Sequence, residues 1–243
     1  MEAYLDNSAT TRVDAQVQEL MKKLMDVDFG NPSSRHQKGV VAEGYIKEAR
    51  QKIAATLKVD PKELIITSGG TESNNMALIG TALAAKRKGN HIITTAVEHP
   101  SVKTTASFLE EQGFRITFLS VDSRGQISLE DLKEALTPDT ILVSIMYVNN
   151  EIGTIQPVEE AAKLVHATVP GAVFHVDAIQ AYGKVLIRPK QQGIDLLSVS
   201  SHKFHGPKGA GFLYCSSKVN LHPIIFGGGQ QSGMRSGTEN VPG

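Results

Sequence analysis

Four polar clusters in this sequence each follow a short hydrophobic run of the kind that forms a buried strand. The first cluster extends from Thr67 to Asn74 and places a glycine turn, Gly69-Gly70, before a helix start. Glycines let a backbone approach an anion closely, and a helix N-terminus offers free N–H groups and a positive dipole end. The spacing is neither that of a nucleotide P-loop nor that of a dinucleotide fold. The cluster therefore suits an anion cradle or a turn whose Ser and Thr side chains cap a helix.

The next two clusters contain a carboxylate and an amine. Asp177 belongs to the cluster His175-Val176-Asp177-Ala178-Ile179-Gln180 at the end of a hydrophobic strand, where a carboxylate either faces a cation or caps the following helix. Lys203 lies among Ser, His and Gly residues in the segment 200–209. Desolvation and nearby cations lower the pKa of such a lysine and free its amine for Schiff-base chemistry, although most isolated lysines are solvated surface charges.

The fourth cluster is Glu98-His99-Pro100-Ser101, and Asn149-Asn150-Glu151 ends a further strand. His99 is a candidate acid–base group, a ring that stacks on a planar ligand, or a structural side chain. Ligands of open α/β sheets bind at the carboxyl ends of the strands, so we expect all these clusters to face one crevice. An anion cradle, a carboxylate, an amine and a flat ring are together what pyridoxal phosphate requires. No H-x-x-x-H pair or G-x-S-x-G elbow is present, which disfavours a metal site and a serine hydrolase.

From residue 64 onward, short β-rich runs alternate with helical segments. This alternation predicts βαβ units and a mostly parallel, seven-stranded sheet with helices on both faces. The last two runs leave no room for a crossover helix, so we expect them to pair antiparallel. The predicted strands are 64–67, 91–95, 115–119, 141–147, 173–177, 195–199 and 211–214.

The first 60 residues predict an extended arm followed by two helices, each with one apolar face. A breaker at 30–34 separates them, and we expect residues 61–243 to form the ligand-binding domain. The apolar positions are Val13, Val17, Leu20, Met21 and Leu24 in the first helix, and Ala42, Ile46, Ala49, Ile53 and Leu57 in the second.

The composition excludes several classes of protein. The 243 residues carry 25 basic and 25 acidic side chains, so no net charge favours nucleic acid. The N-terminus is acidic and polar, unlike a secretory signal, and the longest apolar run, 141–148, is far shorter than the ~20 residues of a membrane helix. The single cysteine, Cys215, allows no internal disulfide and fits a reducing compartment. These features predict a cytoplasmic enzyme that binds neither nucleic acid nor membrane.

The motifs closely resemble those of the cysteine desulfurases of the NifS/IscS type, in the class V aminotransferase branch of the fold-type I pyridoxal phosphate enzymes. The resemblance extends over essentially the whole chain, in order and in spacing. It rests on the segments LDNSATT (5–11), GNPSSRH (30–36), TSGGTESNN (67–75), EH (98–99), NNEIGTIQP (149–157), HVDAIQ (175–180), SSHKFHGPKG (200–209) and GGGQQSGMRSGT (227–238).

The resemblance implies the large domain of the fold-type I enzymes and two catalytic residues. Lys203 would bond covalently to the aldehyde of pyridoxal 5′-phosphate and later move a substrate proton, and His99 would stack on the ring and assist that proton transfer. Asp177 would pair with the ring nitrogen. The remaining cofactor contacts implied are Gly70, Thr71, Ser200 and His202 at the phosphate, Gln180 at the ring hydroxyl, Asn150 beside cofactor and substrate, and Thr238 from a second subunit.

The implied reaction converts L-cysteine to L-alanine and passes sulfur to an enzyme thiol, then to an acceptor or scaffold protein for iron–sulfur cluster assembly or thiolation, in a homodimer. The family's nucleophilic cysteine and substrate-binding arginine lie later in the chain than residue 243, and Cys215 does not match the nucleophile motif. The sequence therefore predicts a chain without the small C-terminal domain, inactive in sulfur transfer by itself, with Cys215 structural. A selenocysteine lyase, another class V aminotransferase, and a non-catalytic fragment that only binds partners are the alternatives.

Overall fold

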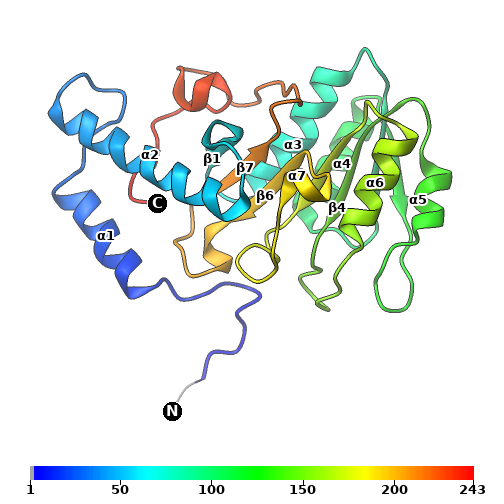
Figure 1. The fold of residues 1–243 in the computed structure, drawn as a ribbon, viewed down its shortest axis with the longest axis horizontal. Helices are drawn as coiled ribbons and strands as arrows, with labels where there is room; N and C mark the ends of the chain where they lie inside the picture. Colours follow the sequence, from blue (N-terminus) through cyan, green and yellow to red (C-terminus); the bar gives the residue numbers. More distant parts are fainter. Residues whose placement is uncertain (1–2) are drawn as a thin grey trace.

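The computed structural model describes residues 3–243 and contains a seven-stranded sheet in the order β1-β7-β6-β5-β4-β2-β3 (Figure 1). Neighbouring strands from β3 across to β6 are parallel, and β7 is antiparallel to both β6 and β1. The mostly parallel sheet and the antiparallel pairing of the last two strands are thus confirmed. The strands are β1 Leu64–Thr67, β2 His91–Thr95, β3 Arg115–Leu119, β4 Thr140–Met146, β5 Val173–Asp177, β6 Leu196–Ser200 and β7 Gly211–Cys215.

The strand boundaries differ from the prediction by single residues, most clearly at β6. Asp195 was predicted to begin this strand, but β6 begins at Leu196 and continues through Ser200. The Asp195 side chain instead accepts a hydrogen bond from the Phe174 backbone N–H at 2.9 Å and lies 3.4 Å from His166 Nε2. A carboxylate engaged in this way ties the start of β6 to the neighbouring strand.

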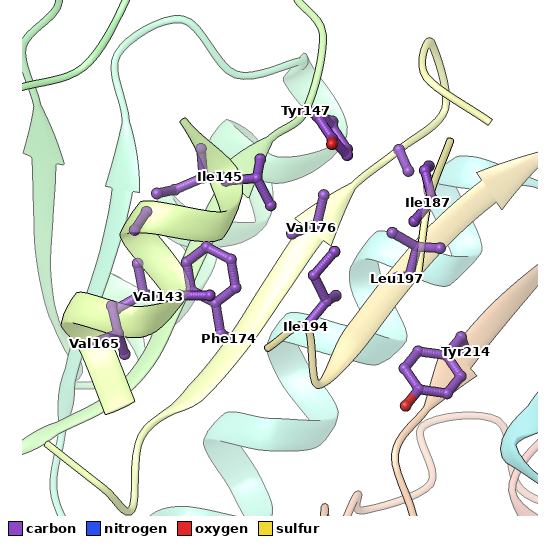
Figure 2. Close-up of a cluster of buried hydrophobic side chains, with 14 of the residues drawn as sticks. Val143, Ile145, Tyr147, Val165, Phe174, Val176, Ile187, Ile194, Leu197 and Tyr214 are labelled. Atoms are coloured by element: carbon purple, nitrogen blue, oxygen red, sulfur yellow. The ribbon is translucent and has the colours of Figure 1, made fainter. Parts of the chain in front are cut away.

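Helices cover both faces of the sheet and enclose two hydrophobic cores. One core lies under α3 and α4, and the other lies under α5, α6 and the end of α2. Side chains alternate between them along each strand: Leu142 joins the first core, whereas Val143 and Ile145 join the second (Figure 2). The helices are α1 Ala15–Asp26, α2 Gln37–Leu57, α3 Gly70–Ala85, α4 Pro100–Glu111, α5 Leu129–Ala135, α6 Val158–Thr168 and the short α7 Pro189–Gln192.

The two N-terminal helices form as predicted, but two of their ten predicted apolar positions are exposed. Figure 1 shows α1 and α2 at the β1 end of the molecule. Leu24 is buried in α1, and Ala42 and Leu57 are buried in α2. Leu20 is 47% exposed and Ala49 is also exposed. Hydrophobic periodicity therefore identified both helices correctly, while the expected burial of their faces is only partly realised within this chain.

No helix within residues 3–243 combines the length and the apolar character needed to span a lipid bilayer.

Candidate active site

A cavity of about 570 Å³ lies where β4, β5 and β6 end, at the edge of the sheet that the strand-end clusters were expected to share. All the predicted site residues except Thr238 line it: Gly70, Thr71, His99, Asn150, Asp177, Gln180, Ser200, His202 and Lys203. Thr238 is exposed on the C-terminal segment, away from this cavity. Its predicted contact with a cofactor in a second subunit stays a prediction.

The glycine turn at the start of α3 is open to an anion. Gly69 has a φ of 145°, a backbone conformation that side chains disfavour, and no side chain caps the helix that begins at Gly70. A Cβ on Gly70 would stand 2.0 Å from Ile179 Cδ1, so glycine keeps the backbone close to its neighbours. Ser200 adds a buried hydroxyl beside the turn. Of the two alternatives left open by the sequence, the geometry therefore favours the anion cradle over the capped turn.

Asp177 presents a buried carboxylate at the end of β5, where 4% of the residue is exposed. Its Oδ1 accepts from the Ile179 backbone N–H at 3.0 Å, and its Oδ2 accepts from Asn74 Nδ2 at 2.8 Å. Burial raises the pKa of Asp177, while the hydrogen bonds from Ile179 and Asn74, and then the nearby His99 and Lys203, oppose the rise. The side chain thus caps the following turn. Because it is desolvated, a cation in the cavity would stabilise its negative charge.

His175 shares the Asp177 side of β5 but does not line the cavity. Its Nδ1 is 2.8 Å from Ser144 Oγ and its Nε2 is 2.9 Å from Ser198 Oγ, so both ring nitrogens are engaged by the neighbouring strands. Burial lowers the pKa of His175 to about 3, and the ring is neutral at physiological pH. Its role in this structure is to join three central strands.

The N-terminal arm closes one side of the cavity around Lys203. The Lys203 ammonium donates to the carbonyls of Ser8 at 2.5 Å and Ala9 at 2.9 Å, and Gln180 Nε2 also donates to Ser8 at 2.8 Å. Desolvation lowers the pKa of Lys203, and the charge of Lys184 lowers it further. Asp6, Ser8 and Ala9 were not predicted as site residues, although the segment 5–11 was among the matched motifs. Ser8 and Ala9 gave no chemical signal in the sequence, because they act through their backbone carbonyls.

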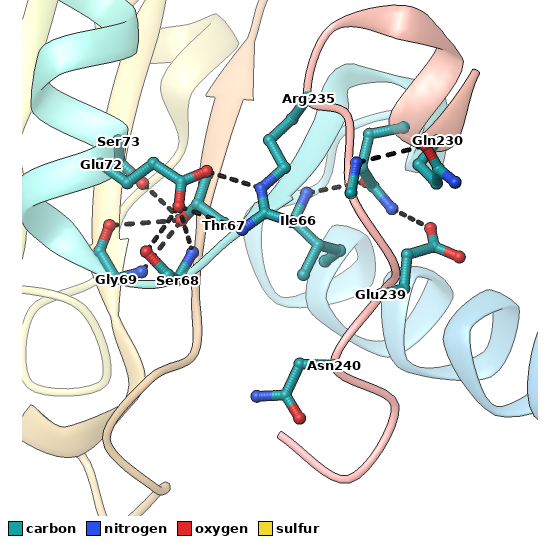
Figure 3. Close-up of polar contacts among 12 residues, drawn as sticks. Ile66, Thr67, Ser68, Gly69, Glu72, Ser73, Gln230, Arg235, Glu239 and Asn240 are labelled. Carbon is teal, nitrogen blue, oxygen red and sulfur yellow. Dashed lines mark hydrogen bonds and ion pairs between the residues drawn. The ribbon is translucent and has the colours of Figure 1, made fainter. Parts of the chain in front are cut away.

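A second unpredicted contact holds the glycine turn to the C-terminal segment (Figure 3). Arg235 Nε donates to Glu72 Oε1 at 2.8 Å, and Arg235 Nη2 lies 3.3 Å from Glu72 Oε2. Glu72 Oε2 also accepts from the Ser68 backbone N–H at 3.0 Å. A two-pronged ion pair of this kind fixes both position and orientation, so the segment that carries Thr238 is tied to the cradle.

Glu98 is a buried acid directly before His99, and the structure gives it a positioning role. Its Oε1 accepts from Thr95 Oγ1 at 2.9 Å and from the Met146 backbone N–H at 2.8 Å, which ties the loop before α4 to the end of β4. Burial, together with the charge of Asp177, raises the pKa of Glu98 to about 8. Glu98 is therefore mostly protonated at neutral pH.

This raised pKa predicts a pH-dependent stability. Between its ordinary pKa of 4.5 and about 8, the folded chain retains a proton that the unfolded chain has released, so Glu98 makes stability fall as the pH rises across this window. The amide of Glu98→Gln resembles the neutral acid and does not titrate. As the pH rises from about 5 to about 8, we expect the free energy of unfolding of Glu98→Gln to increase relative to that of wild type by on the order of a few kcal/mol. Urea denaturation at both pH values measures this gain. Glu111→Gln, at an exposed position of α4, is the control, and parallel pH profiles for Glu98→Gln and wild type would contradict the prediction.

Within residues 3–243, no group of three or more His, Cys, Asp and Glu side chains is arranged to hold a metal ion. The cavity combines an uncapped helix N-terminus, a buried carboxylate and a desolvated lysine. This combination on an open α/β sheet suits a cofactor that has an anionic group, a cationic ring and a carbonyl to which a lysine amine could bond.

Comparison with known proteins agrees with a cofactor of this class. The class-V aminotransferase family matches residues 3–243, and the chain belongs to this family. The cysteine desulfurase IscS of Dictyoglomus turgidum is 50% identical over 242 residues, which are 100% of this chain and 61% of the relative. The chain thus spans about three fifths of the length of the curated relatives it matches.

Two solved structures share the fold. A NifS-like protein superposes with a TM-score of 0.98 at 45% identity, covering 100% of this chain and 67% of its own. The protein SspA, solved in complex with cysteine, superposes with a TM-score of 0.95 at 41% identity, covering 99% of this chain and 70% of its own. Enzymes of this family depend on pyridoxal 5′-phosphate, and the residues around the cavity fit that group: a cradle for its phosphate, a carboxylate for its ring nitrogen and an amine for its aldehyde.

Proposed function

We propose that this chain carries the cofactor-binding part of a cysteine desulfurase, which converts L-cysteine to L-alanine and passes the sulfur to a thiol of the enzyme. The observation that carries the proposal is the convergence of Asp177, Lys203 and the uncapped start of α3 on one cavity. Relatives named cysteine desulfurase match the chain over its whole length. We further propose that residues 61–243 are the cofactor-binding domain and residues 1–60 an arm with two helices.

Different residues of the chain would bind the cofactor, orient the substrate and move its proton. Gly70, Thr71, Ser200 and His202 would hold the phosphate, and Gln180 and Asn150 would orient the ring and the substrate. Lys203 would hold the aldehyde and afterwards move the substrate's Cα proton, a role that the lowered pKa of its desolvated amine favours. Pyridoxal phosphate, when bound, supplies an electron sink for the breaking bonds, and the Asp177 carboxylate would keep its ring nitrogen protonated.

The sulfur-accepting thiol is proposed to be a cysteine other than Cys215. Cys215, the only cysteine among the 243 residues, ends β7 and does not line the cavity. Burial raises the pKa of its thiol to about 12, so almost none is in the nucleophilic thiolate form near neutral pH. On this proposal, the 243-residue chain by itself transfers little sulfur.

We expect Cys215→Ala to leave the activity of the full-length enzyme within about twofold of wild type, because a buried thiol of this kind behaves as a small hydrophobe. Alanine formed from L-cysteine, and the sulfide released when added dithiothreitol reduces the enzyme persulfide, measure the activity. A loss of about tenfold or more, with the fold intact by circular dichroism, would show that Cys215 carries sulfur after all.

The partners follow from the same proposal. The exposed apolar side chains of α1 and its neighbours, such as Leu20, Met25 and Phe29, would be covered in a homodimer, whose second subunit would contribute Thr238 to the site. A sulfur acceptor or scaffold protein for iron–sulfur cluster assembly or thiolation would receive the product sulfur in the cytoplasm.

Rates of the full-length protein on three substrates test the activity. L-cysteine as the preferred substrate, with equal amounts of alanine and sulfide formed when dithiothreitol is present to reduce the persulfide, would support a desulfurase. A preference for selenocysteine or for an amino donor with a keto-acid acceptor would assign a selenocysteine lyase or an aminotransferase instead. Cooperative folding without any binding of pyridoxal phosphate would favour a non-catalytic fragment.

A further inference from the structure

Asn74 stands between two side chains of the cavity, Asp177 and His99. It lies on α3, is fully buried, and its Nδ2 is 2.8 Å from Asp177 Oδ2 and 2.9 Å from Ser101 Oγ. Ser101 Oγ is in turn 2.8 Å from His99 Nδ1. A continuous hydrogen-bonded bridge, Asp177–Asn74–Ser101–His99, therefore joins the end of β5 to the start of α4 through α3.

The direction of each hydrogen bond in this bridge follows from the chemistry of its ends. Asn74 turns its NH₂ group toward Asp177, whose Oδ2 accepts one amide hydrogen, and the second amide hydrogen goes to Ser101 Oγ. Asn74 Oδ1 is correspondingly a buried atom without a hydrogen-bond partner among the described residues. The Ser101 hydroxyl accepts from Asn74, and its own hydrogen is free to point toward His99 Nδ1, 2.8 Å away.

His99 Nδ1 receives a second donor from the backbone. His99 is the N-cap residue of α4, and its Nδ1 accepts from the Ser101 N–H at 3.1 Å. A ring nitrogen that accepts from two donors carries no hydrogen of its own. Because a neutral imidazole has one N–H group, that hydrogen must be on Nε2.

We propose that Asn74 and Ser101 are positioning residues, which orient the Asp177 carboxylate and hold the neutral His99 ring with its single hydrogen on Nε2. The consequence for catalysis rests on the proposed function. His99 lines the cavity, and in this tautomer it offers a bound ring or substrate a hydrogen-bond donor at Nε2 rather than a proton acceptor. Nδ1, the nitrogen that could accept, is already occupied by Ser101.

The tautomer is measured directly by ¹⁵N NMR of the cofactor-free chain, labelled at histidine, with the His99 signals assigned by their absence from His99→Gln. We expect a pyrrole-type Nε2 and a pyridine-type Nδ1 for His99 at neutral pH. A pyrrole-type Nδ1, or averaged shifts from two exchanging tautomers, overturns the proposal. This readout needs neither cofactor nor substrate, so its failure is distinct from a failure of the proposed desulfurase activity.

The role of Ser101 is tested by two variants in the same experiment. Ser101→Ala removes the hydroxyl donor, and the Nδ1 resonance is expected to move toward that of a pyridine-type nitrogen with fewer hydrogen bonds. Ser101→Thr keeps a hydroxyl and is expected to restore the wild-type position. A Nδ1 resonance that is the same in Ser101→Ala as in wild type overturns the proposed hydroxyl contact.

The role of Asn74 is tested with pyridoxal phosphate as the probe. Asn74→Ala removes one of the two donors that hold the Asp177 carboxylate, so we expect affinity for pyridoxal phosphate to fall by about tenfold. Asn75→Ala is the matched control, because Asn75 lies next on α3 and bonds to Thr71 and Thr105 instead. Equal affinities for pyridoxal phosphate in the two variants overturn the proposal that Asn74 positions Asp177. If Asn74→Ala does not fold, the tautomer measurement on the wild type still tests the proposed state of the His99 ring.

Discussion

Replacing Lys203 with alanine is expected to abolish covalent attachment of pyridoxal phosphate to this protein. The Lys203 amine lines the cavity beside Asp177, and its pKa is lowered by desolvation and by Lys184. A lysine that gives up its proton readily is the group that bonds to an aldehyde near neutral pH. After incubation with pyridoxal phosphate, borohydride reduction makes the lysine–cofactor bond permanent. Peptide mapping of the wild-type chain should then find the cofactor on Lys203.

The structure also supplies the control for this experiment. Lys208 is exposed in the same loop and does not line the cavity, so Lys208→Ala should be labelled like the wild type. The expected loss in Lys203→Ala is complete, because no other lysine lines the cavity among the described residues. Stoichiometric labelling of any other lysine in the wild type would reject the assignment.

Replacing Asp177 with asparagine is expected to have opposite effects on cofactor binding and on the stability of the cofactor-free chain. The buried carboxylate would pair with the protonated ring nitrogen, and removal of one partner from a buried charge pair typically costs 3–5 kcal/mol, which corresponds to roughly 10²- to 10³-fold in affinity. Without the cofactor, burial raises the pKa of Asp177, which means that the charged form is disfavoured there. The neutral variant avoids this penalty.

The neighbouring amide makes the substitution tolerable for the fold. Asn74 Oδ1 has no hydrogen-bond partner within residues 3–243, and a rotation of this amide would let it accept from the new side-chain NH₂. We therefore expect Asp177→Asn to bind pyridoxal phosphate at least about a hundredfold more weakly, while its free energy of unfolding without cofactor equals or exceeds that of wild type. Fluorescence titration and urea denaturation provide the two measurements. A variant that binds the cofactor as tightly as wild type would show that Asp177 does not face the ring nitrogen.

The two cores of the sheet show why its strands could be predicted from the sequence. Each central strand is a nearly continuous apolar run, such as Ile141 to Met146, because both of its faces are covered by helices. The polar residues that end these runs then mark the ligand-binding edge, since parallel strands all end on the same side. For this reason Gly70, His99, Asp177 and Lys203 could be predicted to face one crevice before their positions were known.

The contacts that orient these side chains and shift their pKa values could not be predicted in the same way. Asn74 and Asp177 are 103 residues apart, and Lys203 and Ser8 are 195 apart. Neither Asn74 nor Ser8 belongs to a residue type that signals chemistry by itself, and a backbone carbonyl gives no sequence signal at all. Burial is likewise a tertiary property: the apolar faces of α1 and α2 were recognised, yet Leu20 and Ala49 are exposed in the chain.

The sequence by itself determined the order of strands and helices along the chain, the pairing direction of the last two strands and the residues at the strand ends. All of these depend on local periodicity and on the geometry common to parallel sheets. Only the tertiary structure decided which of those residues share a cavity, that α3 starts without a side-chain cap, and that Glu98, Asp177 and Lys203 are desolvated. Desolvation and hydrogen bonding act over a few ångströms, and residues brought that close by folding are widely separated along the chain.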